Sequence, residues 1–159
     1  MSGFTIKADI GGMLAGIDSL AADIDNAARP AAQAGAQVFY DQVVANVAGI
    51  RKKTGNLRRS IYQVYSKDRS AIGKAVYQIG WNAKKAPHGH LVEFGHLQRY
   101  EVTYDPKTGR YFTHKDRPIA PIQIAAKPFL NPAKSRAPQA QDAMEQRFFV
   151  ELQKSGAIK

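Results

Sequence analysis

Two long stretches of the chain repeat apolar residues at helical spacing near its start. Apolar side chains recur every three or four positions between residues 10 and 24, and an alanine-rich series follows between residues 32 and 47. This spacing predicts amphipathic helices. Asp9 and Pro30 suit helix starts, so residues 9–48 should form two helices or one long helix kinked near Pro30. The two series are Ile10, Met13, Leu14, Ile17, Leu20 and Ile24, and then Ala32, Ala36, Phe39, Val43 and Val47.

The same period returns at the end of the chain. Apolar residues spaced four apart predict an amphipathic helix over residues 132–154. Asn131 is a suitable cap and Pro132 suits a first helical position. Pro138 is expected to kink this helix or to move its start. The apolar series is Ala140, Met144, Phe148 and Leu152.

The middle of the chain changes to the two-residue period of strands. Residues 61–65 and 75–81 are rich in aromatic and β-branched side chains and are separated by a polar turn, which predicts an antiparallel hairpin. Residues 99–104 alternate again and are joined to residues 110–113 by the strong turn signal Asp105–Gly109. This second hairpin should be aromatic on one face and polar on the other, and we expect it to project or to form a sheet edge.

Further segments complete the predicted fold. Phe4–Lys7 suits a short first strand, and residues 117–138, which hold five of the eight prolines, should be extended and anchored by Ile119, Ile122 and Ile124. A chain of 159 residues is one domain by length. The prediction is an α+β domain over residues 1–159. Its N-terminal helices (9–48) and C-terminal helix (132–154) pack on a small, mainly antiparallel β-sheet within residues 61–130 that carries a protruding hairpin.

The formal charge of +10 is unevenly distributed. Residues 1–50 hold two basic and five acidic side chains (net −3), residues 51–90 hold ten and one (net +9), and residues 91–159 hold eleven and seven (net +4). A basic connector, residues 50–60, holds Arg51, Lys52, Lys53, Arg58 and Arg59. Concentrated basic charge indicates an anionic partner, either nucleic acid or an acidic protein surface. The alternative is a solvated basic face.

Composition excludes several classes of protein. The absence of cysteine excludes a disulfide scaffold and cysteine-based zinc or redox sites. No signal-peptide pattern and no apolar run of transmembrane length is present, so we expect a soluble protein that is not secreted. Phosphate-binding glycine motifs and nucleophile elbows are also missing. Carboxylates are sparse and unpaired, which argues against acid–base catalysis and metal-dependent nuclease activity.

One cluster has the residue types of a metal site: His88, His90, Glu93 and His96. The two glycines among them argue against a regular helix that would align these side chains. Glu93 lies between Val92 and Phe94, where a carboxylate more often anchors a loop through backbone N–H groups. We therefore expect no metal, no cofactor and no catalytic residues.

Three short stretches stand out in order along the chain: Thr54–Ile61, Pro87–Gly95 within the longer stretch Ala86–Gly95, and Ala126–Ala133. They read TGNLRRSI, PHGHLVEFG and AKPFLNPA. In this order, after a helical N-terminal part, they resemble the tail-completion or head–tail joining (neck) proteins of long-tailed bacteriophages, the family similar to tail protein Z of phage lambda. The resemblance runs across nearly the whole chain. It departs from the family at His88-Gly89-His90 and at the Arg99–Thr113 hairpin, where many relatives have a short loop.

The resemblance implies a structural virion protein with no catalysis, made in the host cytoplasm and placed at the neck or top of the tail. Its partners would be other neck, connector or tail proteins and copies of itself, in a ring for which the family implies six copies. It would also contact DNA in the channel without sequence specificity. No membrane is implied. Arg51, Lys52, Lys53, Arg58 and Arg59 would face DNA or an acidic neighbour. Gly55, Leu57, Glu93, Phe94, Gly95, Pro128, Phe129 and Leu130 would be structural, with Glu93 and Phe94 fixing their loop against the sheet.

The charge distribution also supports a different class, a stand-alone basic nucleic-acid-binding protein. No clear helix-turn-helix or other reader motif is present in the sequence. Salt-dependent binding to arbitrary duplex DNA would distinguish this class from a neck protein.

Overall fold

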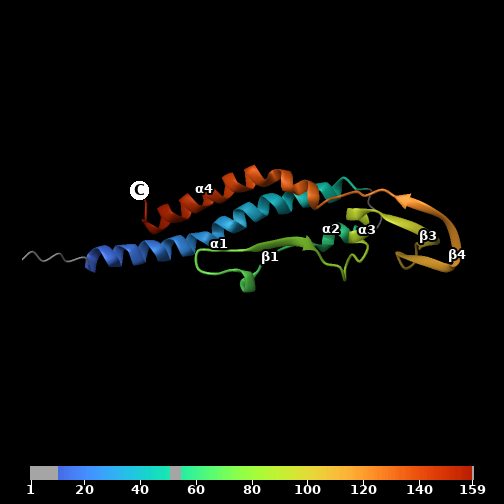
Figure 1. The fold of residues 1–159 in the computed structure, drawn as a ribbon, viewed down its shortest axis with the longest axis horizontal. Helices are drawn as coiled ribbons and strands as arrows, with labels where there is room; N and C mark the ends of the chain where they lie inside the picture. Colours follow the sequence, from blue (N-terminus) through green and yellow to red (C-terminus); the bar gives the residue numbers. More distant parts are fainter. Residues whose placement is uncertain (1–10, 51–54, 159) are drawn as a thin grey trace, which may run out of the picture.

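The computed structural model describes residues 11–50 and 55–158 and shows an elongated molecule. Helix α1 lies between helix α4 on one side and the β1–β2 hairpin on the other, and the β3–β4 hairpin projects from one end (Figure 1). The elements are α1 (Gly11–Ala48), α2 (Asn56–Ser60), β1 (Ile61–Tyr65), the 3-10 helix η1 (Lys67–Arg69), β2 (Tyr77–Trp81), α3 (Gly89–Phe94), β3 (His96–Asp105), β4 (Arg110–Ile124), the 3-10 helix η2 (Asn131–Arg136) and α4 (Ala137–Ser155).

Residues 11–48 form one continuous helix, α1, with Pro30 inside it. This is the single-helix alternative of the sequence prediction. Asp9 and Ile10, and the strand predicted over Phe4–Lys7, lie outside the described residues. None of the described helices is both long and apolar enough to cross a membrane.

The two apolar series of α1 differ in burial. Val43 and Val47 of the second series are buried, whereas Ile17, Leu20 and Ile24 of the first are 56%, 42% and 39% exposed. The reason is length: α1 has 38 residues and α4 has 19, and α1 continues past the end of α4 (Figure 1). The helical period therefore identified the apolar face of α1 correctly. It did not show whether another element of the same chain packs on that face.

The predicted C-terminal helix over residues 132–154 begins later than expected, because η2 precedes α4. Pro138 lies in the first turn of α4, where its missing N–H breaks no helical hydrogen bond. A helix beginning at Pro132 would have placed Pro138 in its interior. The prediction that Pro138 moves the helix start is confirmed. The prediction that Asn131 caps the helix is wrong, because no side-chain cap bond forms at this start.

The strands form two separate two-stranded antiparallel sheets, β1–β2 and β3–β4, in the described part of the chain. In the first, Ile61 lies opposite Trp81 and Tyr65 opposite Tyr77, which confirms the predicted hairpin. The α+β class is confirmed, but the single small sheet of the prediction is two independent hairpins.

The second hairpin is longer than predicted because β4 continues through the proline-rich segment to Ile124. Pro118 lies opposite Tyr100, where the strand register shifts. This irregularity fits a residue that cannot donate to the ladder. Ile122, expected to be an anchor, is 51% exposed. That expectation is wrong because β4 belongs to a projecting two-stranded sheet (Figure 1).

The core lies where the C-terminal half of α1 meets α2, the first hairpin and the segment before η2. The three recognisable stretches of the sequence supply most of its buried residues, although they are far apart along the chain. Their ordered appearance thus reflects the assembly of one core. The buried cluster is Val43, Val47, Leu57, Ile61, Ala86, Phe129 and Ala133.

Candidate interaction surfaces

A buried carboxylate joins the second and third recognisable stretches. Glu93 in α3 is 3% exposed, and its two carboxylate oxygens accept hydrogen bonds from three successive backbone N–H groups. Oε2 accepts from Phe129 at 2.7 Å and Leu130 at 3.0 Å, and Oε1 accepts from Asn131 at 3.0 Å. Hydrogen bonds to an ionised acceptor are stronger than neutral ones. This geometry matches the sequence-based expectation that Glu93 anchors a loop through backbone N–H groups.

The same junction is fixed to α1 and to β2. The side-chain amide of Asn46 donates to the carbonyl oxygen of Phe129 at 2.9 Å. The fully buried ring of Phe129 meets Trp81 edge-to-face, with ring centroids 5.7 Å apart. The Glu93–Phe129 pair is therefore a structural junction between several elements.

Two glycines allow close approaches around this junction. Gly95 ends α3 with φ 71° and ψ 174°, and a Cβ there would lie 2.6 Å from the carbonyl oxygen of Ile124. A Cβ at Gly89 would collide with the indole of Trp81. The neighbouring indole gives a physical reason for a residue without a side chain at this position.

Phe94 does not have the role that its position suggested. Its side chain is 69% exposed, so it does not fix the loop against a sheet. In the short helix α3, Glu93 faces the core, and Phe94, the next residue, points away from it. An exposed Phe beside the base of the β3–β4 hairpin is available to a partner.

The basic connector is described only in its second half. Arg51, Lys52, Lys53 and Thr54 lie outside the described residues. Gly55, with φ 73°, precedes α2, and Leu57 is buried. α2 is a single turn of helix, and Gly55 occupies its N-cap position.

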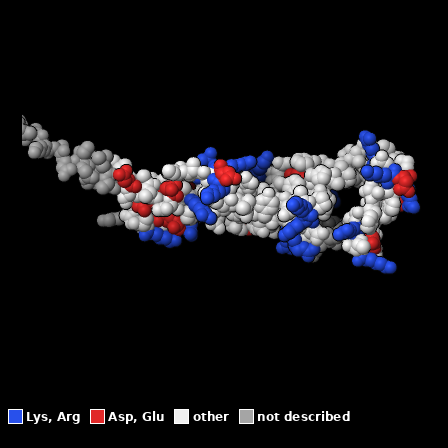
Figure 2. All heavy atoms as spheres, turned by 90° about the horizontal axis from the view of Figure 1, so that it is seen from below, with Lys and Arg blue, Asp and Glu red and all other residues white. Residues whose placement is uncertain are grey.

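Arg58 and Arg59 lie on the exposed side of α2, and the Arg59 guanidinium donates to the Asn56 side chain at 2.7 Å. Viewed from below, the molecule is charged unevenly (Figure 2). Acidic side chains gather toward the N-terminal end of α1, whereas Lys and Arg predominate from the middle to the hairpin end (Figure 2). The structure thus leaves these two arginines accessible to an anionic partner.

The β3–β4 hairpin exposes an unusual amount of apolar surface. Tyr104 and Tyr111 lie opposite each other with ring centroids 4.9 Å apart, and Phe112 pairs with Thr103 on the other face. The prediction of one aromatic and one polar face therefore holds only in part, because Phe112 lies on the face that Glu101, Thr103 and His114 otherwise make polar. An isolated two-stranded hairpin is at best marginally stable, and clustered apolar surface marks interaction sites. The exposed apolar residues are Leu97, Tyr100, Val102, Tyr104, Tyr111, Phe112 and Ile122, each 38–51% exposed.

Glu93, the carboxylate among the histidines near α3, is already engaged. Its carboxylate oxygens already accept the three backbone bonds described above. No group of three or more His, Asp or Glu side chains in residues 11–50 and 55–158 is placed to hold a metal ion. Burial, and secondly the charge of nearby His90, lowers the pKa of His88, which favours its neutral form.

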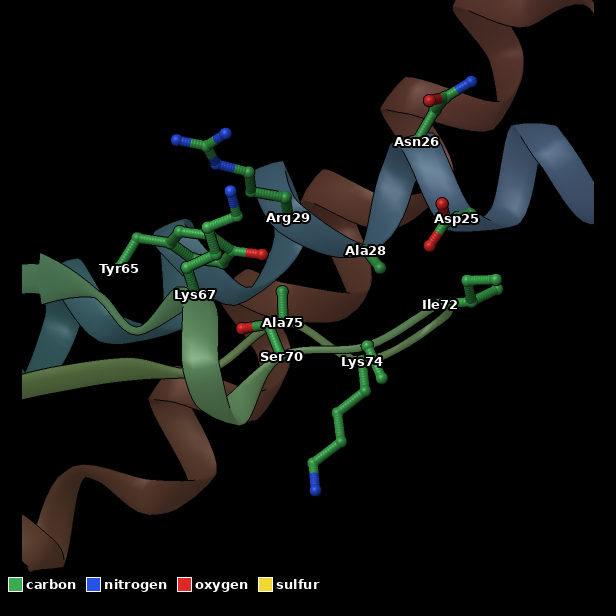
Figure 3. Close-up of a pocket in the computed structure, with 11 residues that line it drawn as sticks. Asp25, Asn26, Ala28, Arg29, Tyr65, Lys67, Ser70, Ile72, Lys74 and Ala75 are labelled. Carbon is green, nitrogen blue, oxygen red and sulfur yellow. The ribbon is translucent and has the colours of Figure 1, made fainter.

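A hollow of about 460 Å³ lies between α1 and the turn region that joins β1 to β2 (Figure 3). The Arg29 guanidinium stacks over the Tyr65 ring at 4.5 Å, and the Asp25 carboxylate accepts a hydrogen bond from the backbone N–H of Gly73 at 2.6 Å. These contacts hold the turn against α1. The Ser70 hydroxyl in the lining is engaged by backbone groups: it donates to the carbonyl oxygen of Ser66 at 2.7 Å and accepts from the N–H of Val76 at 3.0 Å.

The comparison with known families decides the class of protein. Residues 12–95 match the family described as "Bacteriophage HK97-gp10, putative tail-component". The chain belongs to this family. The match covers α1, α2, the first hairpin and α3, and it includes the first two recognisable stretches. No curated protein and no solved structure matched the chain.

Membership of this family indicates the general role of the protein. The family consists of structural components of phage tails and is not an enzyme family, and a tail component belongs to the virion. The resemblance to a family of phage tail proteins is confirmed.

Sequence reasoning missed the exposed face at the N-terminal end of α1. Ile17, Leu20 and Ile24 were assigned to a packed helix. The predicted helix lengths could have indicated this exposed face. The helical region predicted over residues 9–48 is far longer than the helix predicted over residues 132–154, and a shorter helix cannot cover all of a longer one.

Proposed function

We propose that this chain is a neck protein, which completes the end of the tail and makes it competent to join the DNA-filled head. The observation that carries the proposal is the projecting β3–β4 hairpin with its exposed aromatic side chains, in a member of a phage tail family. A lone copy has no evident use for this surface, whereas a subunit held between neighbours does.

The proposed assembly is a ring of copies around the DNA channel, with the copy number of six coming from the family resemblance. The net charge of +10 supports a position near DNA or near an acidic subunit. Arg58 and Arg59, together with Arg51, Lys52 and Lys53, would face that anionic surface. The protein would be made in the host cytoplasm and then incorporated into the virion.

A strain that lacks the whole protein tests this function. Infected cells should accumulate unjoined heads and separate tails, counted by electron microscopy, and the wild-type gene supplied in trans should restore joined particles. Normal numbers of joined, infectious particles without the protein would refute the neck assignment.

The alternative, a stand-alone nucleic-acid-binding protein, rests on the uneven basic charge. Such a protein should bind arbitrary duplex DNA at low protein concentration, with an affinity that falls steeply as salt is raised. Tight autonomous binding together with normal particle assembly in the deletion strain would favour it over the neck role.

A further inference from the structure

The N-terminal end of α1 is an exposed surface that is both apolar and acidic. We call residues 17–28 the α1 tip. Ile17, Leu20 and Ile24 are three and four residues apart, so they share one face of the helix, and each is more than a third exposed. Three aspartates and no basic side chain lie in this segment. Asp18 and Asp23 have no ion pair within the described residues.

The β3–β4 hairpin has the opposite charge. Residues 96–124 hold five basic and three acidic side chains, a net of +2. The acidic ones are already engaged: Arg117 pairs with Glu101 at 3.3 Å and with Asp116 at 3.9 Å, and Asp105 accepts hydrogen bonds in the turn. Four cations have no ion pair in the part of the chain that the structure describes. They are Arg99, Lys107, Arg110 and Lys115.

We propose that the α1 tip of one copy packs against the β3–β4 hairpin of a second copy of this chain. The aliphatic stripe of the tip would cover exposed aromatic side chains of the hairpin, and the aspartates would lie near its unpaired cations. The inference rests on the ring in the proposed function and names the two surfaces that would join its neighbours.

The positions of the two surfaces define the kind of assembly. They lie at opposite ends of the molecule (Figure 1), so a copy that offers its hairpin to one neighbour keeps its α1 tip free for another. Such a head-to-tail contact is heterologous, and it produces a ring where the rotation closes and a filament where it does not.

Symmetric contacts between like ends are disfavoured by charge. A tip facing a tip would bring Asp18 and Asp23 against the same residues of the partner, and a hairpin facing a hairpin would oppose two sets of unpaired cations. Like charges placed together at an interface select against that pairing. The tip-to-hairpin contact buries apolar surface from both sides without this penalty.

Cross-linking through introduced cysteines tests the contact, because the chain has no cysteine of its own. Leu20→Cys and Tyr104→Cys variants, one of them isotope-labelled, are mixed and treated with a bismaleimide linker. Mass spectrometry should show the mixed Leu20–Tyr104 dimer as the main product. Gln139→Cys on exposed α4 is the matched control, and its mixture with Tyr104→Cys should give at least tenfold less dimer. Circular dichroism checks that each variant is folded.

A charge exchange gives the second arm. Lys107→Glu/Arg110→Glu in the Tyr104→Cys chain should reduce the cross-link about tenfold, and Asp18→Lys/Asp23→Lys in the Leu20→Cys chain should restore it. The wild-type cross-link should also decrease as salt is raised. Homodimers of Leu20→Cys as the main product, or no Leu20–Tyr104 link either in concentrated protein or in purified virions, would overturn the proposal.

The experiments distinguish failure of the proposed neck function from failure of the tip-to-hairpin contact. If the strain that lacks the protein assembles normal particles while the cross-link forms, the neck role is wrong and the contact stands. If that strain leaves heads and tails unjoined but the cross-link is absent from protein and virions, the neck role stands and the contact is wrong.

Discussion

Glu93 shows how one side chain can hold together segments that are far apart in the sequence. Its carboxylate accepts hydrogen bonds from three successive N–H groups, two in the segment before η2 and one at the first residue of η2, while Glu93 itself lies in α3. An ionised carboxylate is an acceptor only, and two oxygens suffice for three donors. An amide of nearly the same shape would turn one acceptor into a donor that faces these N–H groups.

Glu93→Gln should therefore destabilise the protein by about 1–3 kcal/mol, since at least one buried backbone N–H loses its acceptor. Urea unfolding followed by circular dichroism measures the change. Glu101→Gln is the matched control: Glu101 is partly exposed and pairs with Arg117, and its loss should change stability by less than about 1 kcal/mol. Equal stability of wild type and Glu93→Gln would show that the junction contributes little.

Two phenylalanines in the recognisable stretches should differ sharply. Phe129→Ala removes a fully buried ring and should cost about 3–5 kcal/mol. Phe94→Ala alters a side chain that is 69% exposed and should change stability by no more than about 0.5 kcal/mol. Both are measured by the same unfolding curves. If Phe94→Ala also reduces head–tail joining at normal protein levels, Phe94 is an interface residue; a large loss of stability would contradict its exposed position.

At the scale of elements, Gly95 permits the chain to leave α3 and enter β3. Its backbone lies where side chains are rarely accommodated, and a Cβ would also press on the carbonyl oxygen of Ile124. Gly109, in the turn of the second hairpin, has φ 66° but nothing within 4 Å of a Cβ. A side chain at Gly109 would therefore meet backbone strain alone, whereas a side chain at Gly95 would meet backbone strain and a steric collision.

Gly109→Ala should destabilise by about 1–2 kcal/mol, the cost of a left-handed backbone for alanine. Gly95→Ala should cost clearly more, because the collision adds to the strain. Thermal unfolding of the two variants gives the comparison. The argument fails if Gly95→Ala is no less stable than Gly109→Ala.

Sequence patterns predicted the elements better than their partners. The long helix α1 and both hairpins follow from local spacing and turn chemistry. The pattern did not show that Ile17, Leu20 and Ile24 lack cover, because periodicity identifies a face and says nothing of what packs on it. Ile122 was misplaced for the same reason. The start of α4 depended on Pro138. The sequence predicted that this proline would kink the helix or move its start, but not that the helix would begin at Ala137.

The candidate surfaces could be predicted only in part. Glu93 was recognised as an anchor because a carboxylate between two apolar residues needs donors, but the donors lie more than thirty residues away and no local rule identifies them. Phe94 was misjudged because a short run of apolar residues does not reveal which of them faces inward. The proposed contact between the acidic α1 tip and the basic hairpin could not be predicted from the sequence. The sequence does not show that these two surfaces lie at opposite ends of the molecule.

At the scale of the whole molecule, charge and exposed apolar surface are distributed along one long axis. The core lies around the three recognisable stretches, and the surfaces available to partners lie at the ends and on α2 (Figures 1 and 2). Stability and assembly should therefore respond to different substitutions. Changes at the core junction should lower stability, whereas changes on α2 or at the ends should leave stability near wild type and affect contacts with partners.

Arg58→Glu/Arg59→Glu tests this separation on the basic connector. Both side chains are exposed, so folding should stay near wild type, with a change in stability of less than about 1 kcal/mol. If α2 faces DNA or an acidic neighbour, reversal of two charges replaces attraction by repulsion, and heads and tails should remain unjoined. The measurement is complementation of the deletion strain with particle counts by electron microscopy. Lys67→Glu/Lys74→Glu, the same charge change at the far end of the first hairpin, is the control and should support joining. Normal numbers of joined, infectious particles from the Arg58/Arg59 variant, made at normal levels, would rule out this role for the connector.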